Sequence, residues 1–207
     1  MGEDFYDILE LKDGQLGLVV GDATGKGVPA ALVMASARSM LRAVAQASDY
    51  SPGDVLRRVN DSLVIDIPPN MFVTCFYAIL DTKSGHLVYA NAAGHDLPYL
   101  WHGGHCEELG ARGIPLGLMA GMRYEEGEVS RREGNCVLFY SDGLVEAHDP
   151  KGEMFGFPRL QTFLAEHGEE QSLEDFLIEE LYTFVGEGWE QEDDITLLTL
   201  ERPTFRS

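Results

Sequence analysis

The stretch that decides the fold is FYDILELKDGQLGLVVGDATGKG, residues 5–27. Its two apolar runs flank the pair Asp13-Gly14, and an Asp-Gly pair in that setting predicts a β-hairpin with a tight turn. In such a hairpin Asp4 and Asp22 lie at the far ends of two paired strands, so we expect them to be close neighbours. The glycine-rich end of the stretch, GDATGKG, allows two interpretations: a phosphate-binding loop, or a strand end whose Asp22 holds a metal ion.

The phosphate-binding interpretation fails on spacing. A Walker A motif needs Gly, four residues, and then Gly-Lys followed by Ser or Thr. Here Val20 stands where the first glycine is required, and Gly27 follows Lys26. An EF-hand calcium loop fails as well, because DGQLG and DPKGE lack alternating oxygen ligands and a closing glutamate at the proper distance. The metal-holding interpretation therefore remains.

Composition and charge restrict the class of protein. A chain of 207 residues is long enough for one domain with a substantial core. Its formal net charge of −20 argues against capture of nucleic acid or of an anionic membrane. We expect a cytoplasmic protein without direct membrane insertion, because no apolar run of 18 residues and no signal-peptide pattern occur. The cysteines, Cys75, Cys106 and Cys136, lack metal-ligand or redox spacing, which suits a reducing compartment.

The remaining patterns predict alternating groups of strands and helices. Helices are expected from Pro29 to about Gln46 and again from Ser51, each with proline in its first turn. Further strands are expected at 71–81, 86–94, 97–102, 135–143 and 193–200, and further helices at 157–168 and 172–188. Strands in hairpin order interrupted by pairs of helices favour an α+β fold, with antiparallel sheets and helices packed outside.

Aspartates recur where an apolar strand meets a turn: Asp4, Asp22, Asp142, Asp193 and Asp194. Each one alone is most simply a turn former or a helix cap. Together they suggest a common cleft, in which several carboxylates would repel one another unless cations lay between them. Carboxylate oxygens are ligands suited to Mg²⁺ or Mn²⁺, and a pair of such ions is typical of hydrolytic phosphoryl transfer.

A family resemblance extends over nearly the whole chain. It is carried, in order, by GEDFYD, GDATGKGVPAALVMA, MFVT, YANAAGH, PLGL, VLFYSDGLVEAHDPKGEMFG and DDITLL. These motifs resemble the bacterial serine phosphatases of the stage-II-sporulation-E and sigma-B-regulator type, in the metal-dependent protein phosphatase 2C superfamily. The resemblance implies a four-layer α-β-β-α sandwich, with two antiparallel sheets flanked by helices. It further implies that the chain lacks its N-terminal edge and upstream regulatory domains.

The resemblance also implies a site that binds two Mn²⁺ or Mg²⁺ ions. Asp22 would bridge the ions beside the backbone carbonyl of Ala23, Asp4 would hold one ion, and Asp142 and Asp193 would hold the other. Asp22 and Asp142 are the residues on which catalysis would chiefly depend. Of the two adjacent acids we select Asp193, because successive residues entering a strand point to opposite sides.

Two positions depart from the family pattern, and a third residue, His95, has a simple structural explanation. Glu3 replaces a glycine before the first aspartate, and Thr24 stands where the eukaryotic branch has a histidine, so no general acid is assigned. His95 is interpreted as a turn histidine that hydrogen-bonds to the backbone, rather than as a general acid or a metal ligand.

The implied activity is hydrolysis of phosphoserine or phosphothreonine in a phosphorylated protein by a metal-activated water. By analogy the substrate would be an anti-anti-sigma-type protein. Two alternatives stay open: a catalytically degenerate module that binds the same partner, and a metal-dependent phosphodiesterase or nuclease, which the net charge disfavours. The sequence does not specify the oligomeric state.

Overall fold

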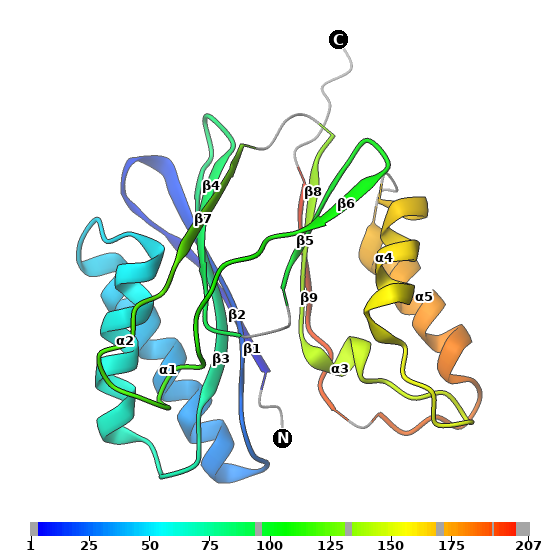
Figure 1. The fold of residues 1–207 in the computed structure, drawn as a ribbon, viewed down its shortest axis with the longest axis horizontal. Coiled ribbons are helices and arrows are strands. Elements are labelled where there is room, and N and C mark those ends of the chain that lie inside the picture. Colours follow the sequence, from blue (N-terminus) through cyan, green and yellow to red (C-terminus); the bar gives the residue numbers. More distant parts are fainter. Residues whose placement is uncertain (1–3, 94–96, 131–133, 169–171, 192, 202–207) are drawn as a thin grey trace. The chain divides into compact units, whose positions relative to one another are not determined.

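The computed structural model describes residues 4–93, 97–130, 134–168, 172–191 and 193–201, and the chain divides into two compact units. Unit 1 comprises residues 1–97 and 110–131, and unit 2 comprises residues 98–109 and 132–207. Each unit contains one antiparallel sheet and one pair of longer helices (Figure 1). The predicted class, an α+β fold of two antiparallel sheets flanked by helices, is confirmed. The assignment of residues 1–207 to one domain stays a prediction.

The hairpin that opens unit 1 forms as the sequence predicts. Strands β1 (Asp4–Glu10) and β2 (Gln15–Ala23) are antiparallel, and the 3-10 turn Lys12–Gly14 joins them. Asp13 and Gly14 both have positive φ, 58° and 80°. Asp and Gly adopt this left-handed backbone more readily than most residues do, which is why the pair suits this turn.

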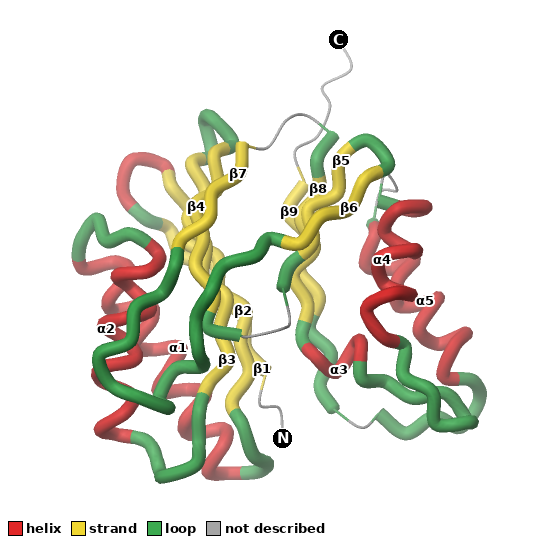
Figure 2. Tube along the Cα trace, in the orientation of Figure 1, coloured by secondary structure: helices red, strands yellow, loops and turns green. Residues whose placement is uncertain are grey.

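The sheet of unit 1 has five strands in the order β1-β2-β3-β4-β7, completed by β3 (Val73–Asp81), β4 (His86–Asn91) and β7 (Glu126–Ser130). Helices α1 (Val28–Ala47) and α2 (Pro52–Asp66) cover one face of this sheet (Figure 2). Their apolar sides form a continuous core with the strands, in which Leu41, Val59 and Tyr77 are fully or almost fully buried. Unit 1 thus has a hydrophobic core of its own.

Helix α1 is, by length and composition alone, long and apolar enough to cross a membrane, with a mean hydropathy of 1.3. In the structure its buried positions follow helical spacing and pack in the core of unit 1. The helix also carries Arg38 and Arg42, which bind the carboxylate of Asp7 on β1. That side chain is 7% exposed, so α1 is joined to the sheet by an ion pair as well as by apolar contacts.

The sheet of unit 2 has four strands in the order β6-β5-β8-β9: β5 (Tyr99–His102), β6 (His105–Glu108), β8 (Cys136–Tyr140) and β9 (Leu197–Glu201). Helices α4 (Gly156–His167) and α5 (Leu173–Val185) pack on it, and the one-turn helix α3 (Asp142–Val145) follows β8. A separate apolar cluster that includes Leu138, Leu160 and Leu177 holds these elements together.

Some elements differ from the sequence prediction. Strands β6 and β7 and helix α3 were not predicted, because HCEE and EGEVS show no apolar alternation and DGLV is a single turn. The last strand was predicted to begin at Asp193 but begins at Leu197. This correction also removes the strand-alternation argument for choosing Asp193 over Asp194.

Candidate metal centre

The first pair of predicted ligands comes together across the opening hairpin. Asp4 and Asp22 are directly opposite one another in the β1–β2 register. Residues paired in this way point to the same face of a sheet with Cβ atoms roughly 5 Å apart, and like charges so placed destabilise the pair. Asp22 lies on a central strand, and its backbone carbonyl accepts a bond from Thr74 Oγ1 on β3 at 3.4 Å. Hairpin register therefore places two carboxylates at one strand end.

The backbone around Asp22 is closely packed. A Cβ atom on Gly21 would lie 2.5 Å from the carbonyl oxygen of Thr74 and 2.9 Å from Cζ of Phe5, so only glycine fits there. Beyond Asp22, Ala23 is 1% exposed and pairs with Val73. Neighbouring strands thus hold both the Asp22 position and the predicted carbonyl ligand.

Thr24 and two glycines control the exit into α1. Thr24 Oγ1 donates to the carbonyl oxygen of Phe72 and accepts from its N–H, each at 2.9 Å. Gly25 and Gly27 then adopt positive φ, 101° and 81°, before α1 begins at Val28. The threonine that departs from the eukaryotic pattern therefore anchors the loop, and the glycines permit the sharp passage into the helix.

The second pair of predicted ligands lies in unit 2. Asp142 is the first residue of α3, directly after β8 and Ser141. Ser141 fixes this turn, because its N–H donates to the carbonyl of Thr196 at 3.0 Å and its Oγ accepts from the N–H of Thr196 at 2.9 Å. A Cβ on Gly143 would clash with the carbonyl oxygen of Asp194. The turn therefore packs closely on the segment that precedes β9.

Asp193 and Asp194 occupy different environments in that segment. The carboxylate of Asp193 accepts a bond from the N–H of Asp194 at 2.9 Å, and its charge acts on Asp142. Burial, followed by the charge of Asp193, raises the pKa of Asp142 above its ordinary value. The carbonyl of Asp194 instead accepts a bond from Ser141 Oγ at 3.4 Å. These contacts favour Asp193 as the acid that acts with Asp142, and its role as a ligand stays a prediction.

Glu146 is a further acid in this neighbourhood that the sequence analysis did not include. It stands four residues after Asp142, and that spacing places both side chains on one side of a helical turn. Burial raises the pKa of Glu146, and the charges of Asp142 and Asp193 raise it further. The i, i+4 spacing of two acids was the available sequence signal.

The four predicted aspartates divide two and two between the units. Among the residues that the structure describes, no group of three or more His, Cys, Asp or Glu side chains is close enough to hold a metal ion. The donor set nevertheless fits Mg²⁺ or Mn²⁺ chemically, because every predicted ligand is a hard oxygen. The raised pKa of Asp142 reflects partly a repulsion that a cation would relieve.

Glu3 and His95 lie outside the described residues. Lys26 is exposed in the loop before α1.

A family model described as Stage II sporulation protein E (SpoIIE) matches residues 12–203. The chain belongs to the SpoIIE family. It is 29% identical over 229 residues to Protein IcfG of Synechocystis, covering 96% of this chain and 36% of that protein. It is 26% identical over 206 residues to the phosphoserine phosphatase RsbU of Bacillus subtilis, covering 98% of this chain and 60% of RsbU. The chain thus spans between about a third and three fifths of these relatives.

Two solved structures have a similar fold. The crystal structure of the RsbU and RsbW domains of Rv1364c from Mycobacterium tuberculosis matches with a TM-score of 0.81 and 28% identity, covering 98% of this chain and 57% of that one. RsbX in complex with magnesium matches with a TM-score of 0.69 and 14% identity, covering 96% of this chain and 86% of that one. The prediction of an enzyme of the phosphatase class is confirmed at the level of the family, whose named relatives include a phosphoserine phosphatase.

Proposed function

We propose that this chain is the catalytic domain of a metal-dependent phosphatase that hydrolyses phosphoserine or phosphothreonine in a protein substrate. The observation that carries the proposal is the register pairing of Asp4 with Asp22 at the end of the opening hairpin. Directly opposed carboxylates are unfavourable in a hairpin unless they bind something positive. The resemblance to RsbU, a named phosphoserine phosphatase, supports the same reaction.

The proposed site uses Asp4, Asp22 and the carbonyl of Ala23 from unit 1, with Asp142 and Asp193 from unit 2, to hold two Mn²⁺ or Mg²⁺ ions. When bound, such ions supply a water nucleophile of lowered pKa and offset the negative charge of the phosphoryl oxygens. RsbX, which shares the fold, has been solved with magnesium.

The fold holds Asp22 and Asp142 in position for this proposed reaction. Asp22 is held by strands on both sides, so its backbone stays in place as charge develops on the substrate. Asp142 is oriented by the Ser141–Thr196 bonds of its turn. No covalent intermediate on the protein is required, since the sequence gives no serine, threonine or cysteine an evident activating triad.

The proposed physiological substrate is a phosphorylated anti-sigma factor antagonist, in a pathway that switches partners to regulate a sigma factor. The similarity to RsbU and to Rv1364c, a protein with RsbU and RsbW domains, supports this choice. Phosphate release from the purified phosphorylated antagonist is the direct test.

Hydrolysis of p-nitrophenyl phosphate tests the chemistry itself. The wild type should hydrolyse p-nitrophenyl phosphate in the presence of Mn²⁺, and hydrolysis should stop when EDTA is added. Asp22→Asn and Asp142→Asn should each lower kcat at least about tenfold, which is roughly 1.4 kcal/mol in barrier. Asp175→Asn is the matched control, because it makes the same charge change at an exposed position of α5 and should stay within about twofold.

Binding of the phosphorylated antagonist, measured together with phosphate release from it, distinguishes a phosphatase from a non-catalytic binding module. A wild type that binds a phosphorylated antagonist but releases no phosphate with Mn²⁺ or Mg²⁺ is a non-catalytic binding module. Full activity in Asp22→Asn would contradict the assignment of Asp22 while leaving the phosphatase activity intact.

A further inference from the structure

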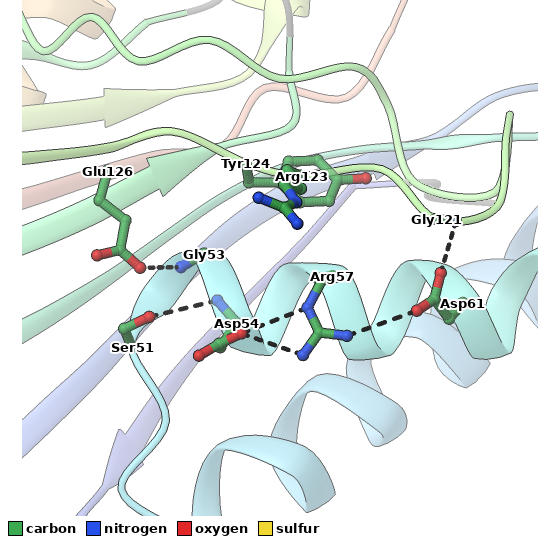
Figure 3. Close-up of a pocket in the computed structure, with 9 residues that line it drawn as sticks. All are labelled: Ser51, Gly53, Asp54, Arg57, Asp61, Gly121, Arg123, Tyr124 and Glu126. Carbon is green, nitrogen blue, oxygen red and sulfur yellow. Dashed lines mark hydrogen bonds and ion pairs between the residues drawn. The ribbon is translucent and has the colours of Figure 1, made fainter.

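A groove on unit 1 lies apart from the predicted metal ligands. It runs between α2 and the segment 121–126 that leads into β7, and its volume is about 640 Å³ (Figure 3). The residues that line it are polar or small, with one aromatic side chain: Ser51, Gly53, Asp54, Arg57, Asp61, Gly121, Arg123, Tyr124 and Glu126.

The acids of the groove already have partners within the fold. Asp54 accepts from Nε and Nη2 of Arg57 at 3.3 and 3.1 Å. Asp61 accepts from the N–H of Gly121 at 2.9 Å and lies 3.8 Å from Nη1 of Arg57. Glu126 accepts from the N–H of Gly53 at 2.8 Å, which satisfies a donor at the start of α2. These contacts hold the two walls of the groove together, and Arg57 offsets part of the negative charge of its three acids.

Arg123 and the hydroxyl of Tyr124 have no partner among the residues that the structure describes. Arg123 is exposed and makes no hydrogen bond or ion pair with any residue in the described part of the chain, and Figure 3 shows its guanidinium turned toward α2. Tyr124 is only 7% exposed, yet its hydroxyl is buried without a hydrogen-bond partner among the described residues. In Figure 3 the hydroxyl points along the groove toward Gly121 and Asp61. A buried hydroxyl in this state costs about 1–3 kcal/mol.

Apolar side chains extend the surface at the Asp61 end. Ile65 follows Asp61 by one helical turn on the same stripe of α2 and is 81% exposed. Leu118 and Met119 are 49% and 60% exposed on the loop just before Gly121.

The loop that presents Leu118 and Met119 is held in place by the fully buried Asn60. Its side chain donates to the carbonyl of Met119 at 2.8 Å and accepts from the N–H of Gly117 at 2.9 Å. A loop backbone held this firmly loses little conformational entropy when a partner covers its apolar side chains.

We propose that this groove, with Ile65, Leu118 and Met119, is a docking site for an extended segment of a partner protein that carries one acidic and one apolar side chain. The acidic side chain would pair with Arg123 and accept a bond from the hydroxyl of Tyr124, and the apolar side chain would cover Leu118 and Met119. Charge complementarity selects this occupant, because Arg123 is the guanidinium in the groove that no internal acid binds. Burial raises the pKa of Tyr124, so the hydroxyl stays a donor. The inference does not rest on the proposed phosphatase activity.

Backbone amide NMR shifts of Gly53 and Gly121 can report binding, since both N–H groups donate to acids of the groove. The probe is the blocked peptide acetyl-Leu-Ala-Gly-Glu-Ala-Gly-amide, and the matched control has Gln in place of Glu. The Glu peptide should give saturable shifts with at least about tenfold higher affinity than the Gln peptide, a difference of roughly 1.4 kcal/mol.

Variants of the groove separate recognition from folding. Arg123→Gln should abolish the preference for Glu, and Arg123→Glu should shift it to a peptide with Lys in that place. Tyr124→Phe should weaken binding of the Glu peptide while leaving the melting temperature unchanged or raised, because it removes an unsatisfied hydroxyl.

Four results would overturn the proposal. The first three are the absence of saturable shifts up to about 10 mM peptide, equal affinity for the Glu and Gln peptides, and retention of the preference for Glu in Arg123→Gln. The fourth is a concentration-dependent shift of Gly121 without peptide, because a second copy of the chain would then occupy the groove.

Discussion

Replacing Arg42 by alanine should destabilise unit 1 more than replacing an arginine whose acidic partner is exposed. Arg42 donates Nε to Oδ2 of Asp7 at 3.1 Å and Nη2 to Oδ1 at 2.5 Å. Asp7 is 7% exposed, whereas the side chain of Arg42 is 45% exposed. Arg42→Ala therefore leaves a buried carboxylate with only Arg38, whose Nε is 3.4 Å away.

The magnitude follows from that geometry. Removing one partner of a fully buried ion pair costs about 3–5 kcal/mol. Because Arg42 is half-exposed and Arg38 remains, we expect about 2–3 kcal/mol. In a chain of this length that loss corresponds to roughly 4–12 °C in melting temperature. Arg38→Ala, which removes a single longer contact, should cost less.

Urea denaturation with circular dichroism measures the effect. The matched control is Arg57→Ala, which breaks a helix-surface pair with the half-exposed Asp54 and should cost about 0.5 kcal/mol. A double-mutant cycle between Asp7 and Arg42 should give a coupling of about 2 kcal/mol. If Arg42→Ala and Arg57→Ala lower the free energy of unfolding equally, burial of Asp7 does not strengthen its ion pair and the prediction is wrong.

Further predictions address the metal site, the packing around it and the thiols. Mn²⁺ at about 100 times Kd should stabilise the wild type by roughly 2.7 kcal/mol per site. Metal-free Asp22→Asn should melt at or above the melting temperature of the metal-free wild type, and Mn²⁺ should stabilise this variant much less. Equal stabilisation of both proteins by Mn²⁺ at constant ionic strength would mean that the ions act at another site. Gly21→Ala should cost about 1–3 kcal/mol, because its Cβ would lie 2.5 Å from the Thr74 carbonyl oxygen; a neutral effect in thermal melts would contradict the close packing. Burial raises the pKa of Cys106 to about 11 and also raises that of Cys75. Iodoacetamide at pH 8 should therefore label both thiols slowly until urea is added. Rapid labelling of the folded protein would contradict the raised pKa values.

Local patterns were sufficient to predict the elements that carry Asp4 and Asp22, the first pair of predicted ligands. The Asp-Gly turn between two apolar runs predicts the hairpin, and hairpin register alone brings Asp4 opposite Asp22. Helices α1 and α2 were predicted to within a residue or two at their starts, because prolines in the first turn and a Ser51 cap are local signals. Strand β3 was predicted nearly in full because its residues are mostly apolar, β-branched or aromatic.

Edge strands and polar contacts were decided by tertiary structure. β6 and β7 have few apolar residues, and they are strands because β5 and β4 offer them backbone partners. The burial of Asp7, the role of Asn60 in holding a loop, and the groove with Arg123 and Tyr124 depend on residues up to about 70 positions apart in the chain. Periodicity reports how a side chain faces its own helix or strand, whereas a polar partner or an uncompensated charge is defined only when distant segments pack together.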